Sequence, residues 1–398
     1  MKKIIVIPGH GVGKEVFSYI LPLLDKINIE YTISDVDHLA SIESIGLKVA
    51  KFKNIFVDSW KSNLFELSPE ERREFEIILK KDDIRHFISF IRGLIFKERL
   101  PSDLIQEFLF TVSRGISPEF RDNVDKYDSI LLGPVETEAG GYFLLWVRAY
   151  LDLYINMRPV KSYNDNKNID MVIVRENSED LYAGIEGMLN EDVYYAKKVT
   201  TKFAVERIAK FAFSMAQERK KNGLSGKVTV VHKANLLGIT DGSFLRISKE
   251  ISKLYEGIEL NDIHVDNCAM QLILNPEQFN ILLAPNLYGD ILSDEASALV
   301  GGLGLAPSVQ KGDRYSVFGP VHGTAPDIAG KGIANPLATV LSIAMMCDHL
   351  GMKKESDLIE MGVRKLIQKG IKTVDLGGKS TTKEVCNGLI NAMDDADA

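Results

Sequence analysis

The sequence predicts an α/β protein with a mainly parallel central sheet, and two observations support that prediction. Short, continuous apolar runs recur along the chain, as expected of strands that are buried on both faces. Segments with helical periodicity separate these runs, and such alternation is typical of βαβ units. A third observation modifies the pattern, because one long helical block interrupts the alternation between about residues 49 and 124.

The first apolar run, Lys3–Ile7, predicts a buried strand, followed by a glycine-rich turn and a helix from about Lys14 to Lys26. The other predicted strands have the same continuous apolar character: Ser129–Leu132, Asp170–Val174, Lys227–Val231 and Ile281–Ala284. Between them the sequence predicts helices, among them Thr201–Asn222 and Ser293–Val300.

The block from about Val49 to Val124 is charged, aromatic and helical in period. Ser68 and Pro69 have the character of a helix cap and first turn. Two apolar stripes follow at spacings of three and four residues: Ile84, Phe87, Ile88, Ile91 and Ile95, then Leu104, Phe108 and Val112. We interpret the block as a helical insertion in an α/β domain, and one hypothesis is that it docks a partner.

Composition excludes several classes of protein. The 398 residues include 48 Lys and Arg against 55 Asp and Glu, a net charge of −7 that argues against nucleic acid as the main partner. The longest apolar stretch, Leu337–Cys347, is too short to span a membrane, and the N-terminal run is too short for a signal peptide. Three widely spaced cysteines favour a reducing compartment, so we expect a cytoplasmic protein.

Three arginines, Arg148, Arg158 and Arg175, lie at element ends among apolar residues. A guanidinium is costly to desolvate there unless it meets a carboxylate or phosphate, so the three suggest a site for a small polyanion. Ordinary surface ion pairs are the alternative.

Carboxylates offer a second candidate site. Asp290 and Asp294 would lie one helical turn apart on the same face, where they repel each other unless a cation lies between them. Oxygen ligands suit Mg²⁺ or Mn²⁺. A solvated acidic helix start is the alternative. Asp266 is a third candidate that sequence distance cannot place.

Lys233 follows an apolar strand directly, where a lysine can be desolvated enough for proton transfer, and Tyr182 is a candidate partner acid. Two glycine-rich loops are less specific. The loop Gly9–Gly13 is either a phosphate cradle or a simple tight turn, and it matches neither the dinucleotide fingerprint nor the P-loop. The loop from His322 to Gly330 could hold a nucleotide.

Together these motifs resemble the β-decarboxylating dehydrogenases, the isocitrate/3-isopropylmalate dehydrogenase family. Four segments carry the resemblance in family order: Arg175–Gly184, His232–Asn235, Asn286–Glu295 and His322–Pro336. The resemblance extends from Met1 to about Lys48 and again from about Lys126 onward, so it lapses over the insertion.

The resemblance implies a two-domain subunit in a homodimer with shared active sites. One domain would combine residues 1–153 and 301–398 and bind the cofactor, while residues 154–300 would form the dimer contact. Arg148, Arg158 and Arg175 match the residues that bind the malate-like core of the substrate. Asp290 and Asp294 match metal ligands, with Asp266 supplied by the neighbouring subunit. Tyr182 and Lys233 match the acid/base pair, with Lys233 acting across the dimer.

The resemblance also assigns the cofactor. Its cofactor-binding residues would be His322, Gly323, Thr324, Ala325, Asp327, Ile328 and Asn335. The Asp327-Ile328 pair matches the NAD-using members, because an aspartate accepts hydrogen bonds from ribose hydroxyls and would repel the 2′-phosphate of NADP. The expected reaction is NAD-dependent oxidative decarboxylation of a 2-hydroxy diacid with Mg²⁺ or Mn²⁺.

The expected substrate is 3-isopropylmalate or a related alkylmalate. Isocitrate enzymes bind the third carboxylate with a Ser-x-Asn pair, and the matching positions here are Tyr142 and Leu144. An apolar pocket cannot satisfy a carboxylate, but burying an isopropyl group there would contribute roughly 2–3 kcal/mol. Isocitrate or homoisocitrate is the alternative substrate, since the motifs around Tyr182 and Lys233 look more like isocitrate enzymes.

Three departures from the family pattern remove negative charge near the ligands: His10, Pro285 and Gly319 stand where glutamate or another acid is usual. These changes leave open a regulatory subunit without catalysis. Retention of the arginines, the metal-binding aspartates, Tyr182 and Lys233 favours an active enzyme.

Overall fold

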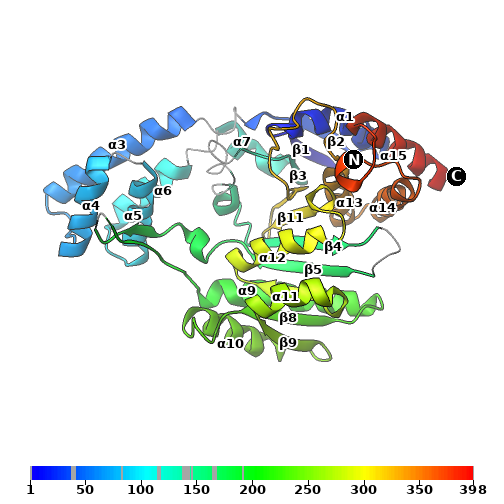
Figure 1. Ribbon diagram of the computed structural model, residues 1–398. Helices are drawn as coiled ribbons and strands as arrows, with labels where there is room; N and C mark the ends of the chain where they lie inside the picture. The colour runs from blue at the N-terminus through cyan, green and yellow to red at the C-terminus, as the bar shows by residue number, and fades with distance from the viewer. Residues whose placement is uncertain are drawn as a thin grey trace.

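The computed structural model describes residues 2–36, 42–81, 84–113, 118–136, 144, 147–163, 168–190 and 192–397. These form an α/β structure around one ten-stranded, mostly parallel sheet, which confirms the predicted fold class (Figure 1). The strands of that sheet are β1 Lys3–Ile7, β2 Glu30–Ile33, β3 Ser129–Leu132, β4 Ile155–Lys161, β5 Asp170–Glu176, β8 Lys227–His232, β9 Glu259–His264, β10 Ile281–Ala284, β11 Pro307–Lys311 and β12 Ser316–Pro320. A separate hairpin pairs β6 Glu186–Met188 with β7 Tyr194–Ala196.

The described helices begin and end as follows: α1 Val12–Lys26, α3 Ile42–Lys61, α4 Pro69–Lys81, α5 Ile84–Phe96, α6 Ser102–Ser113, α7 Pro118–Asn123, α9 Lys202–Lys221, α10 Thr240–Ser252, α11 Val265–Leu274, α12 Asn286–Ala298, α13 Leu337–His349, α14 Lys353–Gln368 and α15 Thr382–Asp397. A short 3₁₀ turn, η2, spans Leu181–Ala183. No helix within the described ranges is both long and apolar enough to cross a membrane.

The strand order is β2-β1-β3-β12-β11-β4-β5-β10-β8-β9. Two parallel blocks, β2-β1-β3-β12 and β5-β10-β8-β9, meet through β11 and β4, which pair antiparallel with each other and with their outer neighbours. Because β5, β10, β8 and β9 run in the same direction, their carboxyl ends share one edge of the sheet. Arg175, Lys233 and Asp266 all lie at or just beyond that edge.

Buried apolar side chains form four clusters. Two of them are built from residues between 154 and 300, on either side of the second parallel block. A third combines α1, β1 and the C-terminal helices, with Tyr163 as its one buried member from the middle of the chain. The fourth joins β1 and β3 to the helices between Ile42 and Val124. The division into residues 1–153 plus 301–398 and residues 154–300 stays a prediction.

The predicted helical character of the inserted block is confirmed: α3, α4, α5 and α6 form an arm on the side away from the two termini (Figure 1). Its first helix begins at Ile42, seven residues before the predicted start. Phenylalanines fill its centre: Phe56 lies 5.2 Å from Phe75 and 5.8 Å from Phe87 between ring centroids, and all three rings are fully buried. Edge-to-face rings of this kind pack densely, and they belong to the same buried cluster that reaches β1 and β3.

Several boundaries differ from the sequence predictions. Helix α12 begins at Asn286 rather than Ser293, because Pro285 ends the preceding strand and the Asp180 carboxylate accepts a hydrogen bond from the Leu287 amide at 2.8 Å. Strands β2, β4, β9, β11 and β12 of the large sheet were not predicted. Strand β4 contains Pro159, and β9 at the sheet edge is mostly polar, so neither has the apolar run that identified the five predicted strands.

The start of α4 has the predicted cap. The Ser68 hydroxyl accepts from the Glu71 amide at 3.2 Å, and the Glu71 carboxylate accepts from the Ser68 amide at 2.9 Å. Glu71 also pairs with Lys97, the residue after α5, at 2.7 Å. Burial would raise the pKa of Glu71, but Lys97 and the Ser68 amide outweigh burial and lower it. The reciprocal cap fixes the start of α4, and the ion pair with Lys97 joins α4 to the end of α5.

We expect Ser68→Ala to lower the free energy of unfolding by about 1 kcal/mol, because the Glu71 amide loses its acceptor. Urea unfolding followed by circular dichroism would measure the change. Ser62→Ala, in an exposed position after α3, is the matched control and should leave the midpoint unchanged. Equal midpoints for both variants would contradict the cap.

Candidate active site

The three predicted arginines converge. Arg175, at the end of β5, is 1% exposed, and Arg158 on β4 is 8% exposed. Burial lowers the pKa of Arg148, and the positive charges of Arg175 and Arg158 lower it further. Arg158 and Arg175 also share the Asp290 carboxylate, and Arg148 lines the same cavity as Arg158, so the three guanidinium groups lie near one another. The Nη2 of Arg175 is buried without a hydrogen-bond partner among the described residues, so this cluster has donor capacity for an anionic ligand.

Asp290 on α12 connects the arginines to Tyr182. Its carboxylate pairs with Arg158 at 3.0 Å and also with Arg175, and it accepts a hydrogen bond from the Tyr182 hydroxyl. Burial would raise the pKa of Asp290, but the two arginines outweigh burial and lower it. Burial, together with the hydrogen bond to Asp290, raises the pKa of Tyr182. Tyr182 is therefore a protonated phenol at neutral pH, with Arg175 4.9 Å from its ring centre.

The predicted metal ligands lie in two places within one chain. Asp290 and Asp294 share a face of α12, and Asp294 lies 3.3 Å from Arg158. Asp266, at the start of α11, pairs instead with the Lys233 ammonium at 2.6 Å. Across the described ranges, no three His, Cys, Asp or Glu side chains gather as a metal site would require. One chain thus supplies two carboxylates at one place and one at another.

Lys233 stands on a turn after β8, and buried groups hold its backbone. The Lys233 amide donates to the Asp241 carboxylate at 2.7 Å, and the Ala234 amide donates to His232 Nδ1 at 3.1 Å. Asp241 is fully buried, and burial lowers the pKa of His232 despite the nearby Asp262. The position of the Lys233 side chain is therefore set by a rigid turn.

A buried ion bridge links the two halves of the predicted acid/base pair. The Lys198 ammonium lies 2.9 Å from Asp180 and 3.0 Å from Asp241, and both carboxylates are nearly inaccessible to solvent. Asp180 precedes the η2 turn that carries Tyr182, and Asp241 holds the Lys233 turn. The ring of Tyr288 on α12 lies 4.3 Å from the same ammonium. The pattern-based reasoning missed Lys198, because nothing in the sequence places it beside either aspartate.

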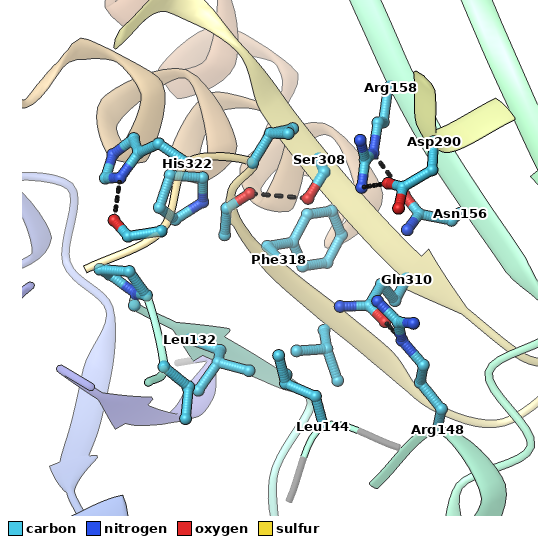
Figure 2. A pocket seen from close by; sticks show the side chains of 18 residues that line it. Leu132, Leu144, Arg148, Asn156, Arg158, Asp290, Ser308, Gln310, Phe318 and His322 are labelled. Atoms are coloured by element: carbon cyan, nitrogen blue, oxygen red, sulfur yellow. Dashed lines mark hydrogen bonds and ion pairs between the residues drawn. The ribbon is translucent and has the colours of Figure 1, made fainter. Parts of the chain in front are cut away.

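A cavity of about 280 Å³ opens beside the arginines (Figure 2). Arg148, Arg158, Asp290, Asn156 and Gln310 form one side of it. The Arg148 Nε donates to the Gln310 side chain at 2.5 Å, and Gln310 also accepts from Asn177 at 3.3 Å. Sequence reasoning missed Asn156 and Gln310, which lie side by side on β4 and β11 and could have been found only from the strand register.

Apolar residues also line the cavity: Leu132, Val135, Leu144, Val317 and Phe318. In Figure 2, Leu132 and Leu144 lie on the side away from Arg158 and Asp290. Leu144 was one of two residues predicted to bind the substrate's side group. The other, Tyr142, lies outside the described residues.

The predicted cofactor loop borders the same cavity through His322 and Gly323. Burial lowers the pKa of His322, and its Nε2 is buried without a hydrogen-bond partner in the described part of the chain. Asp327 is exposed and Ile328 packs on the neighbouring core, so the aspartate is accessible from solvent. Asn335 has a structural position instead, because it donates to Asp375 at 2.9 Å and accepts from the Leu337 amide at 3.0 Å.

Thr324 and Ala325 contact the first glycine loop. The Val12 amide donates to the Thr324 carbonyl at 2.9 Å, and a Cβ on Gly11 would lie 2.1 Å from that oxygen. Ala325 has a positive φ of 41°. Because the loop amides of His10 and Val12 already donate to backbone carbonyls, the tight-turn interpretation of residues 9–13 is favoured over a phosphate cradle.

The structure explains one of the three departures, Gly319, and places the other two. A side chain at Gly319 would place its Cβ 2.0 Å from the Leu132 carbonyl oxygen, so glutamate does not fit there without a shift of β3. Pro285 precedes the first residue of α12 in an extended conformation. His10 Nδ1 accepts from the Glu136 amide at 3.2 Å, which ties the glycine loop to the segment after β3.

Comparison with known proteins defines the class. The isocitrate/isopropylmalate dehydrogenase family matches residues 105–389, and the chain belongs to that family. Its activity is accordingly that of a β-decarboxylating dehydrogenase of malate-type hydroxy acids.

The relatives carry different substrates in their names. The chain is 46% identical to a 3-isopropylmalate/3-methylmalate dehydrogenase of Methanocaldococcus jannaschii, over 65% of this chain and 78% of that protein. It is 45% identical to a homoisocitrate dehydrogenase of the same organism, over 78% of this chain and 94% of that protein. The crystal structure of an isocitrate dehydrogenase from Methylococcus capsulatus aligns with a TM-score of 0.72 at 30% identity and covers 99% of both chains.

Removing the charge from Lys198 should destabilise the protein strongly, because it leaves two carboxylates buried without a counter-ion. We expect Lys198→Met to lower the free energy of unfolding by about 3 kcal/mol, as for other buried pairs broken on one side. Lys202→Met is the matched control, since Lys202 is exposed and pairs only with Glu206 on its own helix. Denaturant unfolding measures both variants. Similar losses of unfolding free energy in the two would mean that the Lys198 bridge contributes no more than an exposed ion pair.

Proposed function

We propose that this protein catalyses NAD-dependent oxidative decarboxylation of a 2-hydroxy diacid, with 3-isopropylmalate or a related alkylmalate as the preferred substrate. The observation that carries the proposal is the mixed lining of the cavity, in which Leu132 and Leu144 lie away from Arg158 and Asp290. The alternative substrates are isocitrate and homoisocitrate. Asn156 and Gln310 in the same cavity favour that alternative, because they could bind a polar side group.

Arg148, Arg158 and Arg175 would bind the two carboxylates that all of these substrates share. The unpaired Nη2 of Arg175 and the mutual repulsion of the three groups support this role, because a bound dianion relieves both costs. Binding through several arginines also fixes the orientation of the reacting carbon atoms.

The carboxylate pair on α12 fits a divalent cation, since oxygen donors one helical turn apart suit Mg²⁺ or Mn²⁺. Asp290 and Asp294 would hold the ion together with Asp266 of a second copy of the chain. When bound, the ion would stabilise negative charge on the substrate oxygen. Burial raises the pKa of Asp294, and the neighbouring Asp290 raises it further, which is the repulsion that a cation would remove.

Proton transfer would fall to Lys233 and Tyr182. Lys233 would take the proton of the substrate hydroxyl, either directly or through water. Tyr182 would return a proton to the substrate carbon after CO₂ leaves, and its raised pKa keeps it protonated for that step. The hydrogen bond from Tyr182 to Asp290 holds the phenol beside the arginine cluster in the meantime.

The loop at His322 fits a nucleotide cofactor, because the buried His322 Nε2 lacks a partner and the exposed Asp327 carboxylate can accept hydrogen bonds from ribose hydroxyls. We therefore assign NAD to this loop, with Gly323, Thr324, Ala325 and Ile328 forming its backbone and apolar surroundings. NAD would accept the hydride from the substrate carbon that bears the hydroxyl.

We propose further that the protein is a homodimer. Lys233 and Asp266 pair with each other in one chain, and no contact in the described structure joins them to Asp290. Apolar side chains stand exposed on the same elements: Leu236, Ile239, Met270, Ile273, Leu274 and Ile291. A second copy covering this face would bury them and bring its Lys233 and Asp266 to the Tyr182 site. The three buried, unpaired cysteines are in keeping with a cytoplasmic location.

The assay of the purified chain with NAD and Mg²⁺ against isocitrate, homoisocitrate, 3-isopropylmalate, malate and tartrate tests the proposal, with NADH absorbance as the readout. We expect 3-isopropylmalate to give the highest kcat/KM. Leu144→Asn should lower that value about ten-fold, because a polar amide replaces part of the apolar wall. Leu189→Asn, exposed outside the cavity, is the control.

A preference for isocitrate or homoisocitrate would overturn the alkylmalate assignment and point to Asn156 and Gln310 as partners of the third carboxylate. Binding of diacids without any turnover would instead support a regulatory subunit.

Shared active sites make a separate prediction. Tyr182→Phe and Lys233→Met should each lower kcat at least about 100-fold, since each removes one proton-transfer group. Mixing the two variants under conditions that exchange subunits should restore activity to about a quarter of the wild-type value, because each mixed dimer contains one intact site. Tyr194→Phe, at an exposed tyrosine, is the control for the first variant. Failure of the mixture to regain activity would show that Lys233 serves its own chain.

A further inference from the structure

Helix α5 of the inserted arm lies against the segment that follows Tyr182. Ser89 of α5 is 5% exposed, and its hydroxyl oxygen lies 2.7 Å from the Gly184 carbonyl oxygen and 2.8 Å from the Glu186 carbonyl oxygen. The same hydroxyl accepts a hydrogen bond from the Glu186 amide at 2.7 Å. One serine from the arm thus satisfies backbone groups on both sides of Ile185.

Two neighbouring contacts strengthen this attachment. The Arg92 Nη1, one turn further along α5, lies 3.5 Å from the Ala183 carbonyl oxygen. A Cβ on Gly184 would lie 2.6 Å from the same nitrogen, so the glycine permits the close approach. On β6, a Cβ on Gly187 would lie 1.9 Å from a carboxylate oxygen of Glu74, and Glu74 accepts a hydrogen bond from Tyr195 of β7 at 3.0 Å.

The turn that carries Tyr182 depends on such outside contacts. None of the three η2 residues is buried, and the turn is flanked by two residues with left-handed backbone, Asp180 at φ 72° and Gly184 at φ 64°. A non-glycine residue in that region needs support from its surroundings. Asp180 anchors one end through Lys198 and the Leu287 amide. The arm anchors the other end through Ser89.

We propose that the helical insertion positions Tyr182 for proton transfer, with Ser89 as its positioning residue. This inference rests on the proposed function, since it gives the arm a role in the same active site. The arm would act from outside the cavity: it touches the backbone at Ala183, Gly184 and Glu186, whereas Tyr182 itself contacts Asp290 and Arg175. This role differs from the docking of a separate partner, which the sequence alone had left open for the insertion.

Kinetics of Ser89→Ala in the full chain test the proposal. Displacement of a catalytic group by about 1 Å can lower a rate up to 100-fold, so we expect kcat to fall about ten-fold. The KM values for the diacid and for NAD should stay within about two-fold, because the arginines and the cofactor loop are untouched. Phe52→Leu is the matched control: Phe52 is buried in the arm 6.1 Å from Phe87, so its loss loosens the arm without removing a contact to residues 181–187.

Hydrogen–deuterium exchange gives a readout that does not depend on activity. Peptides covering residues 181–187 should exchange faster in Ser89→Ala than in the wild type, because the Glu186 amide loses its acceptor. In Phe52→Leu the faster exchange should be confined to peptides of the arm.

Two results would overturn the inference: unchanged kcat in Ser89→Ala, or unchanged exchange at residues 181–187. A wild-type chain that turns over none of the diacids would refute the proposed function instead. In that case the exchange comparison still decides whether Ser89 holds the Tyr182 turn.

Discussion

The ion pair between Arg175 and Asp290 is the constraint on which the site depends. Arg175 is almost fully buried at the end of β5, and a buried guanidinium is tolerated only where a carboxylate and further acceptors meet it. Asn286 supplies a second acceptor at 2.8 Å from Nε. Both partners belong to α12, so the helix must approach the strand closely. Gly289 allows this, because a Cβ there would lie 2.7 Å from the Arg175 Cβ.

The same helix is tied through buried charge to the turns that carry Tyr182 and Lys233, the predicted acid/base pair. Asp180 binds the Leu287 amide at the start of α12 and precedes Tyr182, while Lys198 joins Asp180 to Asp241, which holds the Lys233 turn. Because a buried charge without a partner is costly, these turns cannot shift independently. Ser89 of the arm adds a further contact. The segment around Tyr182 is thus held by the Leu287 amide, Lys198 and Ser89.

The sequence predicted the parts of the site that lie within a few residues of one another. Asp290 and Asp294 share a face of α12 as the helical spacing required, and apolar runs correctly located β1, β3, β8 and β10. Residues joined only by folding escaped the pattern. Gln310 accepts from Arg148 on a strand, β11, that pairs antiparallel with β4. Lys198 pairs with Asp180 and Asp241, which are 18 and 43 residues away in sequence. No local spacing in the sequence encodes either contact.

The net charge of −7 and the anionic substrate class are compatible because recognition is local. In the proposed function the shared malate core binds to Arg148, Arg158 and Arg175, whose mutual repulsion is strongest when no anion lies between them. Those arginines cannot distinguish one family substrate from another, since all carry the same two carboxylates. In the proposed function, discrimination would come from the apolar residues of the cavity, where Leu144 and Val317 favour an alkyl group over a third carboxylate. Gln310 weighs on the other side: Arg148 and Asn177 engage its side-chain oxygen, and its amide NH2 is the donor that a third carboxylate would need.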